Sequence, residues 1–221
     1  MKHLLKILII MILTSISCTN SKNNTENTMD ENVIRVASPG MHIMFSKAKF
    51  EKYIFSEPYF LSPYKFFVAS TNDSINKLED MYGKKLGFHT GSSAHEYMKA
   101  LDPEGKIEIV SFSPDSVATV PINVANGKID AALEAVIIFP NLKESTGLDI
   151  KMVGDVVFTE VNAFPFRKDE KGKKLCDEVS KTIIEMREDG TLEKLAIKWF
   201  GYNPMEGLDV NAELEKLLST F

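Results

Sequence analysis

The chain has 221 residues, with 26 Lys and Arg against 31 Asp and Glu and a formal net charge of −5. A mildly acidic chain of this kind, without a basic cluster, argues against nucleic acid as a partner. Only Cys18 and Cys176 are present, so no disulfide is available to a chain whose Cys18 is modified. We expect Cys176, which lies inside a helical pattern, to be a small buried apolar residue.

The first residues have the pattern of a secretory signal peptide. Lys2 and Lys6 precede an apolar run over 7–13, and small residues follow before Cys18. The run is too short to cross a membrane. The residues around Cys18 resemble a bacterial lipobox, which implies that lipid on Cys18 anchors an exported protein in the periplasm or at the cell surface. An ordinary secretory signal that leaves Cys18 unlipidated is the alternative.

A polar stretch separates Cys18 from the folded part of the chain. Residues 19–31 are almost entirely Asn, Thr, Ser, Lys, Asp and Glu, and this composition predicts a solvated tether. The folded part is then expected to start near Val33. It would contain roughly 190 residues, which is enough for one domain or for two small lobes.

The rest of the chain alternates short apolar runs with helical patterns. The expected strands are 33–37, 64–69, 85–89, 107–111, 129–133 and 149–153. The expected helices are 93–101, 116–126, 135–146, 171–187 and 191–200. Because strands and helices alternate, the pattern predicts the α/β class with mainly parallel strand pairing.

The last of these helices has clear ends. Thr191 can cap its start, and Gly201 follows its last residue. One face carries Leu192 and Trp199, so this face must pack on the body of the protein. We expect Trp199, the only Trp of the chain, to anchor it.

Four sequence motifs occur in order along the folded part. They are FSEPYF at 55–60, INKLEDMYGKKLGFHTGSSAHEYM at 75–98, VANGKIDAALEA at 124–135 and MREDGTLEKLAIKWFG at 186–201. Their order and spacing resemble those of family 3 extracellular solute-binding proteins, the polar amino-acid receptors of ABC importers. The resemblance implies a periplasmic binding protein-like type II fold, in which two α/β lobes joined by hinge strands close on a small ligand. On this basis we expect an ABC permease as a partner and neither enzymatic activity, a metal nor a cofactor.

The first lobe of this fold is expected to be incomplete. Family members place roughly sixty to seventy residues between the first strand and the FSEPYF segment, enough for two strand-helix units and a further strand, whereas only 38–54 lie there in this chain. The expected division is a signal peptide over 1–17, a lipidated Cys and tether over 18–31, a partial first lobe over 32–73 and 163–221, and a second lobe over 74–162. A lobe without one of its layers leaves apolar helix faces uncovered. We therefore expect either self-association through the first lobe or a first lobe that is loose in solution.

The residues between the expected strand 85–89 and the expected helix 93–101 are the candidate for one side of the ligand site. Around Gly91, Ser92 and Ser93, backbone N–H groups and hydroxyls converge where the helix dipole favours an anion. The resemblance implies that the ligand's α-carboxylate rests on these three residues. A plain helix cap made by Ser92 or Ser93 is the alternative.

Two positions depart from the family pattern. The family's carboxylate-gripping arginine falls on Lys49, in a segment that starts at Ser46, and Lys49 supplies the charge but not the planar fork. The family's acid for the ligand's ammonium falls on Ala135, which leaves Glu134, one residue earlier, as the candidate. A shift of one residue along a strand turns the side chain to the other face of the sheet. The predicted ligand-binding set is therefore Ser46, Lys49, Gly91, Ser92, Ser93 and Glu134.

Two other functions stay open. An exported dehydratase-like enzyme on this scaffold would need an acid and a base that converge in the cleft, and no Ser-His-Asp elbow, Cys-His pair or P-loop is visible. His89, at the strand end before the helix start, is most simply a surface residue. The third function is a solute-binding-like lipoprotein that acts as an interaction or sensory module without transport. The shortened lobe, Lys49 and Ala135 favour that function.

Overall fold

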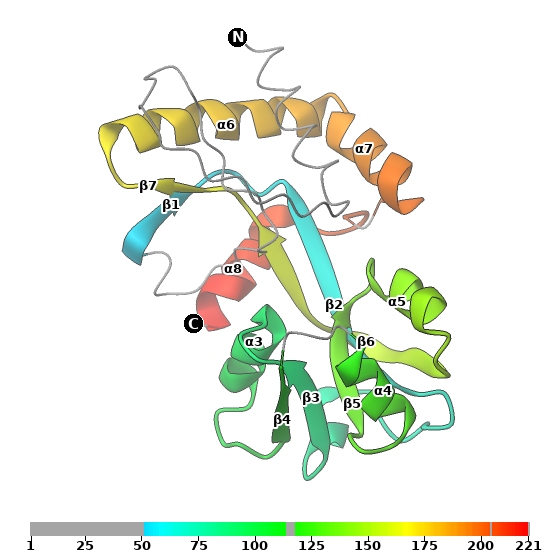
Figure 1. The fold of residues 1–221 in the computed structure, drawn as a ribbon. Coiled ribbons are helices and arrows are strands. Elements are labelled where there is room, and N and C mark those ends of the chain that lie inside the picture. Colours follow the sequence, from blue (N-terminus) through cyan, green and yellow to red (C-terminus); the bar gives the residue numbers. More distant parts are fainter. Residues whose placement is uncertain (1–50, 114–117, 204, 221) are drawn as a thin grey trace, which may run out of the picture.

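The computed structural model describes residues 51–113, 118–203 and 205–220, which form two lobes (Figure 1). One lobe is built on a five-stranded sheet, and the other on a two-stranded sheet with helices. The expected strand at 33–37, the lipidation residue Cys18 and the candidates Ser46 and Lys49 lie outside the described residues.

The five-stranded sheet has the strand order β4-β3-β5-β2-β6. The strands are β2 Phe60–Ala69, β3 Lys85–His89, β4 Glu108–Phe112, β5 Ala131–Ala135 and β6 Ile150–Asn162. β3 pairs parallel with β4 and β5, whereas β2 pairs antiparallel with both β5 and β6. The prediction of mainly parallel pairing was therefore wrong. The chain enters this lobe along β2 and leaves it along β6, so these two strands run in opposite directions.

β2 and β6 also connect the two lobes, because both extend beyond the second-lobe sheet (Figure 1). We call the end of this strand pair that lies in the second lobe its lower part, and the end toward the first lobe its upper part. The sequence patterns predicted only the lower part, as strands over 64–69 and 149–153. In the upper part, where Leu61 pairs with Val161, the strands also bury the polar residues Ser62, Glu160 and Asn162. These polar residues interrupt the apolar pattern from which a strand is predicted.

An irregularity divides the upper and lower parts of this strand pair, between Tyr64 and Phe66 of β2. On β6, Gly154 at this point has a φ of 69°. A Cβ atom at Gly154 would also collide with the backbone carbonyl of Asn76. Both the left-handed conformation and the close approach of another backbone therefore require glycine here.

Helices cover both faces of the second-lobe sheet. α3 Ser93–Leu101 packs on one face, in a core that includes Phe66 and Phe158. α4 Thr119–Ala125 and α5 Phe139–Thr146 pack on the other face. Both predicted ends of α3 were confirmed. The short 3-10 helix η1 Leu78–Met81 was not predicted from the sequence. α5 starts later than the predicted residue 135, because β5 continues to that residue.

The first lobe combines two short strands with two helices on their far side from the second lobe (Figure 1). β1 Tyr53–Phe55 pairs antiparallel with β7 Pro165–Arg167, and α6 Glu170–Glu188 and α7 Thr191–Phe200 follow. Asp169 caps α6 by accepting a hydrogen bond from the Gly172 N–H at 2.7 Å. Both helices were predicted from the sequence, whereas strands of three residues are too short to give a periodic pattern.

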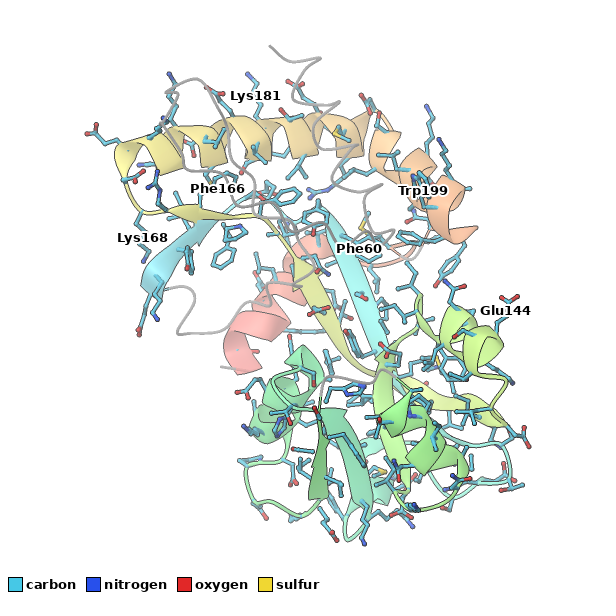
Figure 2. All side chains as sticks on the ribbon, in the orientation of Figure 1. Phe60, Glu144, Phe166, Lys168, Lys181 and Trp199 are labelled. Atoms are coloured by element: carbon cyan, nitrogen blue, oxygen red, sulfur yellow. The ribbon has the colours of Figure 1, made fainter. Side chains whose placement is uncertain are left out.

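α7 has the predicted bounds but not the predicted anchor. Leu192 and Ala196 are buried, whereas Trp199 is 48% exposed (Figure 2). The expectation that Trp199 anchors the helix was wrong, because the last turn of α7 extends past the core that Leu192 and Leu195 reach. Phe200 makes the contact there instead, with its ring centroid 5.6 Å from that of Phe60 on β2.

A further helix, α8 Val210–Thr220, was not predicted. It packs on β6, and the side chains of Val210 and Leu214 contact the second-lobe core. Cys176 is buried on α6, as predicted, and burial raises the pKa of its thiol. Within 51–113, 118–203 and 205–220, no helix combines the length and apolar character needed to cross a membrane. The same residues contain no group of His, Cys, Asp and Glu side chains arranged to hold a metal ion.

Candidate ligand site

A pocket of about 110 Å³ lies at the carboxyl ends of the parallel strands β3 and β5. This edge of an α/β sheet is where ligands usually bind. The walls of the pocket come from the three strands β2, β3 and β5 and from the three helices α3, α4 and α5. The lining residues are Tyr64, Phe67, Gly87, Phe88, His89, Ser92, Ala94, Val120, Pro121, Leu133, Glu134 and Leu142.

The start of α3 forms the polar end of this pocket. Gly91 has a φ of 78°, which turns the chain from β3 into the helix. Ser92 is the N-cap, and its hydroxyl accepts a hydrogen bond from the His95 N–H at 3.3 Å. Ser93 is the first residue of α3. The structure thus brings the predicted helix start to the pocket, and Ser92 both caps the helix and lines the cavity.

The candidate acid Glu134 also lines the pocket. In the β2–β5 register Ala135 pairs with Tyr64, and Glu134 pairs with Lys65, so Glu134 and Ala135 lie on opposite faces of the sheet. Glu134 Oε1 accepts a hydrogen bond from the Ala135 N–H at 2.8 Å. This bond holds the carboxylate close to the end of β5, beside the cavity.

His89 lies at the pocket wall rather than on a bare surface. Its Nδ1 is 3.3 Å from the carbonyl oxygen of Ser113, a geometry in which Nδ1–H donates to that oxygen. In the neutral ring Nε2 is then an acceptor. His89 was expected to be a surface residue, although its place at the strand end beside Thr90 and Gly91 was a signal for a residue of the site.

Tyr64 is a pocket residue that the sequence analysis missed. Its hydroxyl donates to Glu160 Oε2 at 3.4 Å, and Glu160 is completely buried on β6. Burial, and then the charge of Glu160, raises the pKa of the nearby Tyr59 to about 12. The available signal was Glu160 itself, one of two acids on β6, between Thr159 and Val161. It places a buried carboxyl group where the strands pass between the lobes.

The geometry of the described residues is that of one wall of a site. A volume of about 110 Å³ is well below the roughly 300–1,000 Å³ of pockets that enclose a small ligand. A helix start favours an anion, and a carboxylate on the same cavity favours a cation. The other predicted side of the site, Ser46 and Lys49, lies outside the described residues.

Comparison with known families gives a match over residues 30–202 to the bacterial extracellular solute-binding proteins, family 3. This chain is a family 3 solute-binding protein. The four motifs from which the family was predicted all lie within the matched segment. Members of the family are solute-binding proteins rather than enzymes.

Curated relatives agree with this assignment. The chain is 35% identical over 167 residues to the putative amino-acid ABC transporter-binding protein PatH of Vibrio harveyi, covering 76% of this chain and 66% of the relative. It is 34% identical over 150 residues to the probable amino-acid-binding protein YxeM of Bacillus subtilis, covering 68% and 56%. The family 3 chain thus spans less than two thirds of these relatives, which is consistent with the predicted shortening of the first lobe.

Solved structures confirm the type II binding-protein fold. A probable amino-acid ABC transporter extracellular-binding protein of Bacillus subtilis, ytmK, has a TM-score of 0.63 at 26% identity, covering 72% of this chain and 69% of that one. A putative L-cystine ABC transporter protein from Listeria monocytogenes has a TM-score of 0.61 at 28% identity, covering 73% and 70%.

Proposed function

We propose that the mature protein is the solute-binding component of an ABC importer and binds an amino acid or a similar small carboxylate between its lobes. The observation that carries the proposal is the shared pocket of Ser92, at a helix start, and Glu134, on β5. A helix start and a carboxylate suit the two opposite charges of an amino acid.

Each proposed site residue has a separate task. The N–H groups and hydroxyls of Gly91, Ser92 and Ser93 hold the ligand's α-carboxylate, and Glu134 faces its ammonium group. Ser46 and Lys49 approach the carboxylate from the first lobe. The second-lobe pocket is too small to enclose a ligand alone, so closure of the first lobe supplies the remaining wall.

The ligand class is supported by the names of relatives. Besides PatH and YxeM, the L-cystine-binding protein TcyJ of Escherichia coli is 28% identical over 72% of this chain and 58% of its own length. The shared ligand chemistry of these proteins is an amino acid. We extend that class, and not a particular amino acid, to this chain.

We also propose how the exported protein is organised, from the pattern of its N-terminal residues and the order of its lobes along the chain. Residues 1–17 are removed as a signal peptide, Cys18 carries lipid, and 19–31 form the tether to the periplasmic or outer face of a membrane. The proposed division is a first lobe over 32–73 and 163–221 and a second lobe over 74–162, with residues 64–69 of β2 contributed to the sheet of the second lobe. The permease is the partner in transport. The exposed side chains of Ile197 and Trp199 support self-association through the first lobe.

A thermal-shift screen across amino acids, organic acids and neutral sugars tests the proposed function. At least one amino acid should raise the melting temperature of the wild-type protein, and Ser92→Ala and Glu134→Gln should each weaken that response. Glu144→Gln is the matched control, because Glu144 is an exposed acid on α5 (Figure 2). A response to a neutral sugar and to no carboxylate would refute the proposed ligand class.

A second candidate function is an interaction or sensory module without transport. The exposed Trp199 and Tyr202 and the small pocket favour this candidate. No thermal response to any compound, together with capture of a protein partner that Trp199→Ala abolishes, would establish it in place of ligand binding.

A further inference from the structure

The sheet of the second lobe forks at one edge. β3 and β5 are paired as far as Gly87 and Ala132, but both strands continue past this pair, to His89 and Ala135. At those ends β3 is paired with β4, and β5 is paired with β2. The carboxyl ends of β3 and β5 therefore belong to two different halves of the sheet, and we call the space between them the fork. The point where neighbouring strands separate is a common place for a ligand in an α/β sheet.

The pocket of about 110 Å³ lies in the fork, because residues from both strand ends line it. The lining residues there are Phe88 and His89 of β3, Leu133 and Glu134 of β5, and Ser92 at the start of α3. The polar residues His89, Ser92 and Glu134 are half-buried, whereas Phe88 and Leu133 are buried. The polar side chains thus surround the outer end of the pocket, at the edge of the sheet.

The inner end of the pocket is apolar. Phe67 of β2, Val120 of α4 and Leu142 of α5 line it, and all three are buried in one apolar cluster. Among the described residues that line the pocket, the remaining polar side chain is that of Tyr64, whose hydroxyl donates to Glu160. A polar ligand group at the inner end would lose its hydrogen bonds to water without replacement, whereas an apolar group would gain by leaving water.

The size of the pocket limits what its inner end can hold. A cavity of roughly 150 Å³ holds benzene, so about 110 Å³ has room for an aliphatic chain of about three or four carbons. A phenyl ring together with its methylene group is too large for this space. The charged groups of an amino acid would stay at the outer end, beside Ser92 and Glu134.

We propose that the fork binds the side chain of the ligand, and that the ligand is an amino acid with an aliphatic side chain of about three or four carbons. This inference rests on the proposed function, in which Ser92 and Glu134 hold the two charged groups of the ligand. The second lobe alone then selects the side chain, and the first lobe closes over the charged end. Each methylene group that enters the fork should strengthen binding about three- to four-fold.

The first test uses pairs of amino acids that have the same shape and differ in polarity. Calorimetric titration of the wild-type protein should show valine binding at least about ten-fold tighter than threonine, and leucine at least about ten-fold tighter than asparagine. Affinity should also rise from alanine through 2-aminobutyrate to norvaline, and phenylalanine should bind more weakly than leucine. Equal or tighter binding of the polar member of each pair would overturn the aliphatic class and leave the proposed function standing. If no amino acid binds, the proposed function fails, and the aliphatic class fails with it.

The second test enlarges the inner end of the pocket. Leu142→Ala should raise the affinity for phenylalanine relative to leucine by at least about five-fold, because the shortened side chain makes room for the ring. Leu195→Ala is the matched control, since it removes the same atoms from the core of the first lobe. The ratio of two affinities does not depend on the fraction of the variant that is folded. An unchanged ratio in Leu142→Ala would overturn the assignment of the fork to the side chain.

The third test needs no amino acid. Dissolved xenon should shift the methyl resonances of Val120, Leu133 and Leu142 in the wild-type protein, because an apolar cavity of this size takes up xenon. The methyl resonances of Leu195 are the control and should not move. An absence of shifts at all three residues would overturn the apolar cavity itself. Shifts in a protein that binds no amino acid would support the cavity and place the failure in the proposed function.

Discussion

The hydroxyl of Tyr64 donates a hydrogen bond to the completely buried carboxylate of Glu160, across the two strands that join the lobes. The pair links β2 to β6 through side chains at the level where the sheet of the second lobe ends. A buried acid that loses a hydrogen-bond donor keeps the full cost of its removal from water. This connection should therefore affect the stability of the whole molecule.

Tyr64→Phe should lower the free energy of unfolding by about 1–3 kcal/mol, because a buried carboxylate loses a donor. Urea unfolding followed by circular dichroism measures this change. Tyr82→Phe is the control, since Tyr82 is largely exposed and should change stability by less than about 0.5 kcal/mol. Equal stability of the two variants would show that the Tyr64 hydroxyl contributes nothing to the fold.

Ionisation of Tyr59 should lower the free energy of unfolding at alkaline pH. Its pKa is raised to about 12 in the folded protein, whereas the unfolded chain loses the proton near its ordinary value of 10.0. The contribution of Tyr59 is thus complete below pH 10 and is lost as the pH rises toward 12. Tyr59→Phe should reduce the loss of stability between pH 9 and 11 by about 1 kcal/mol. Unfolding curves at these two pH values, compared with the wild type, measure the difference.

Gly154→Ala should destabilise the protein strongly. Both the positive φ and the approach of the Asn76 carbonyl disfavour a side chain, and we expect a loss of at least about 2–3 kcal/mol. Gly83→Ala is a matched control, because Gly83 has a similar φ of 74° but open space around it. It should cost only about 1 kcal/mol. Similar melting temperatures for the two variants would contradict the close contact at Gly154.

Lipid on Cys18 should hold the mature protein at the membrane. We expect the wild-type protein to be released by detergent and not by salt, because the polar residues 19–31 provide no apolar anchor. Cys18→Ala should move the protein to the soluble fraction after cell fractionation. An unchanged distribution of Cys18→Ala would contradict lipidation.

The sequence predicted those elements whose apolar periodicity is complete. α3 and α7 have the predicted bounds, because each carries a helical apolar face between clear end signals. The lengths of β2 and β6 were underestimated, because their upper parts bury Ser62 and Glu160 among apolar neighbours. The apolar pattern could not predict whether neighbouring strands are parallel or antiparallel. Both arrangements can be made from the same residues, and they differ only in the path of the chain between the strands.

The candidate site was predicted only in part, for a similar reason. Ser92 and Glu134 were named as candidates because each belongs to a local motif, and the structure places both on one pocket. Tyr64 and Glu160 are separated by 96 residues in the chain. Nothing local in either segment indicates the other. Their contact depends on the register of β2 against β6, which only the folded sheet sets.

The irregularity between Tyr64 and Phe66 has a mechanical consequence. Tyr64 pairs with Phe158 and Phe66 with Val153, so Lys65 alone on β2 faces residues 154–157 on β6. β6 therefore carries three residues more than β2 over this span, so its direction can change here while the pairs on either side stay intact. We expect this irregularity to be the place where one lobe tilts relative to the other.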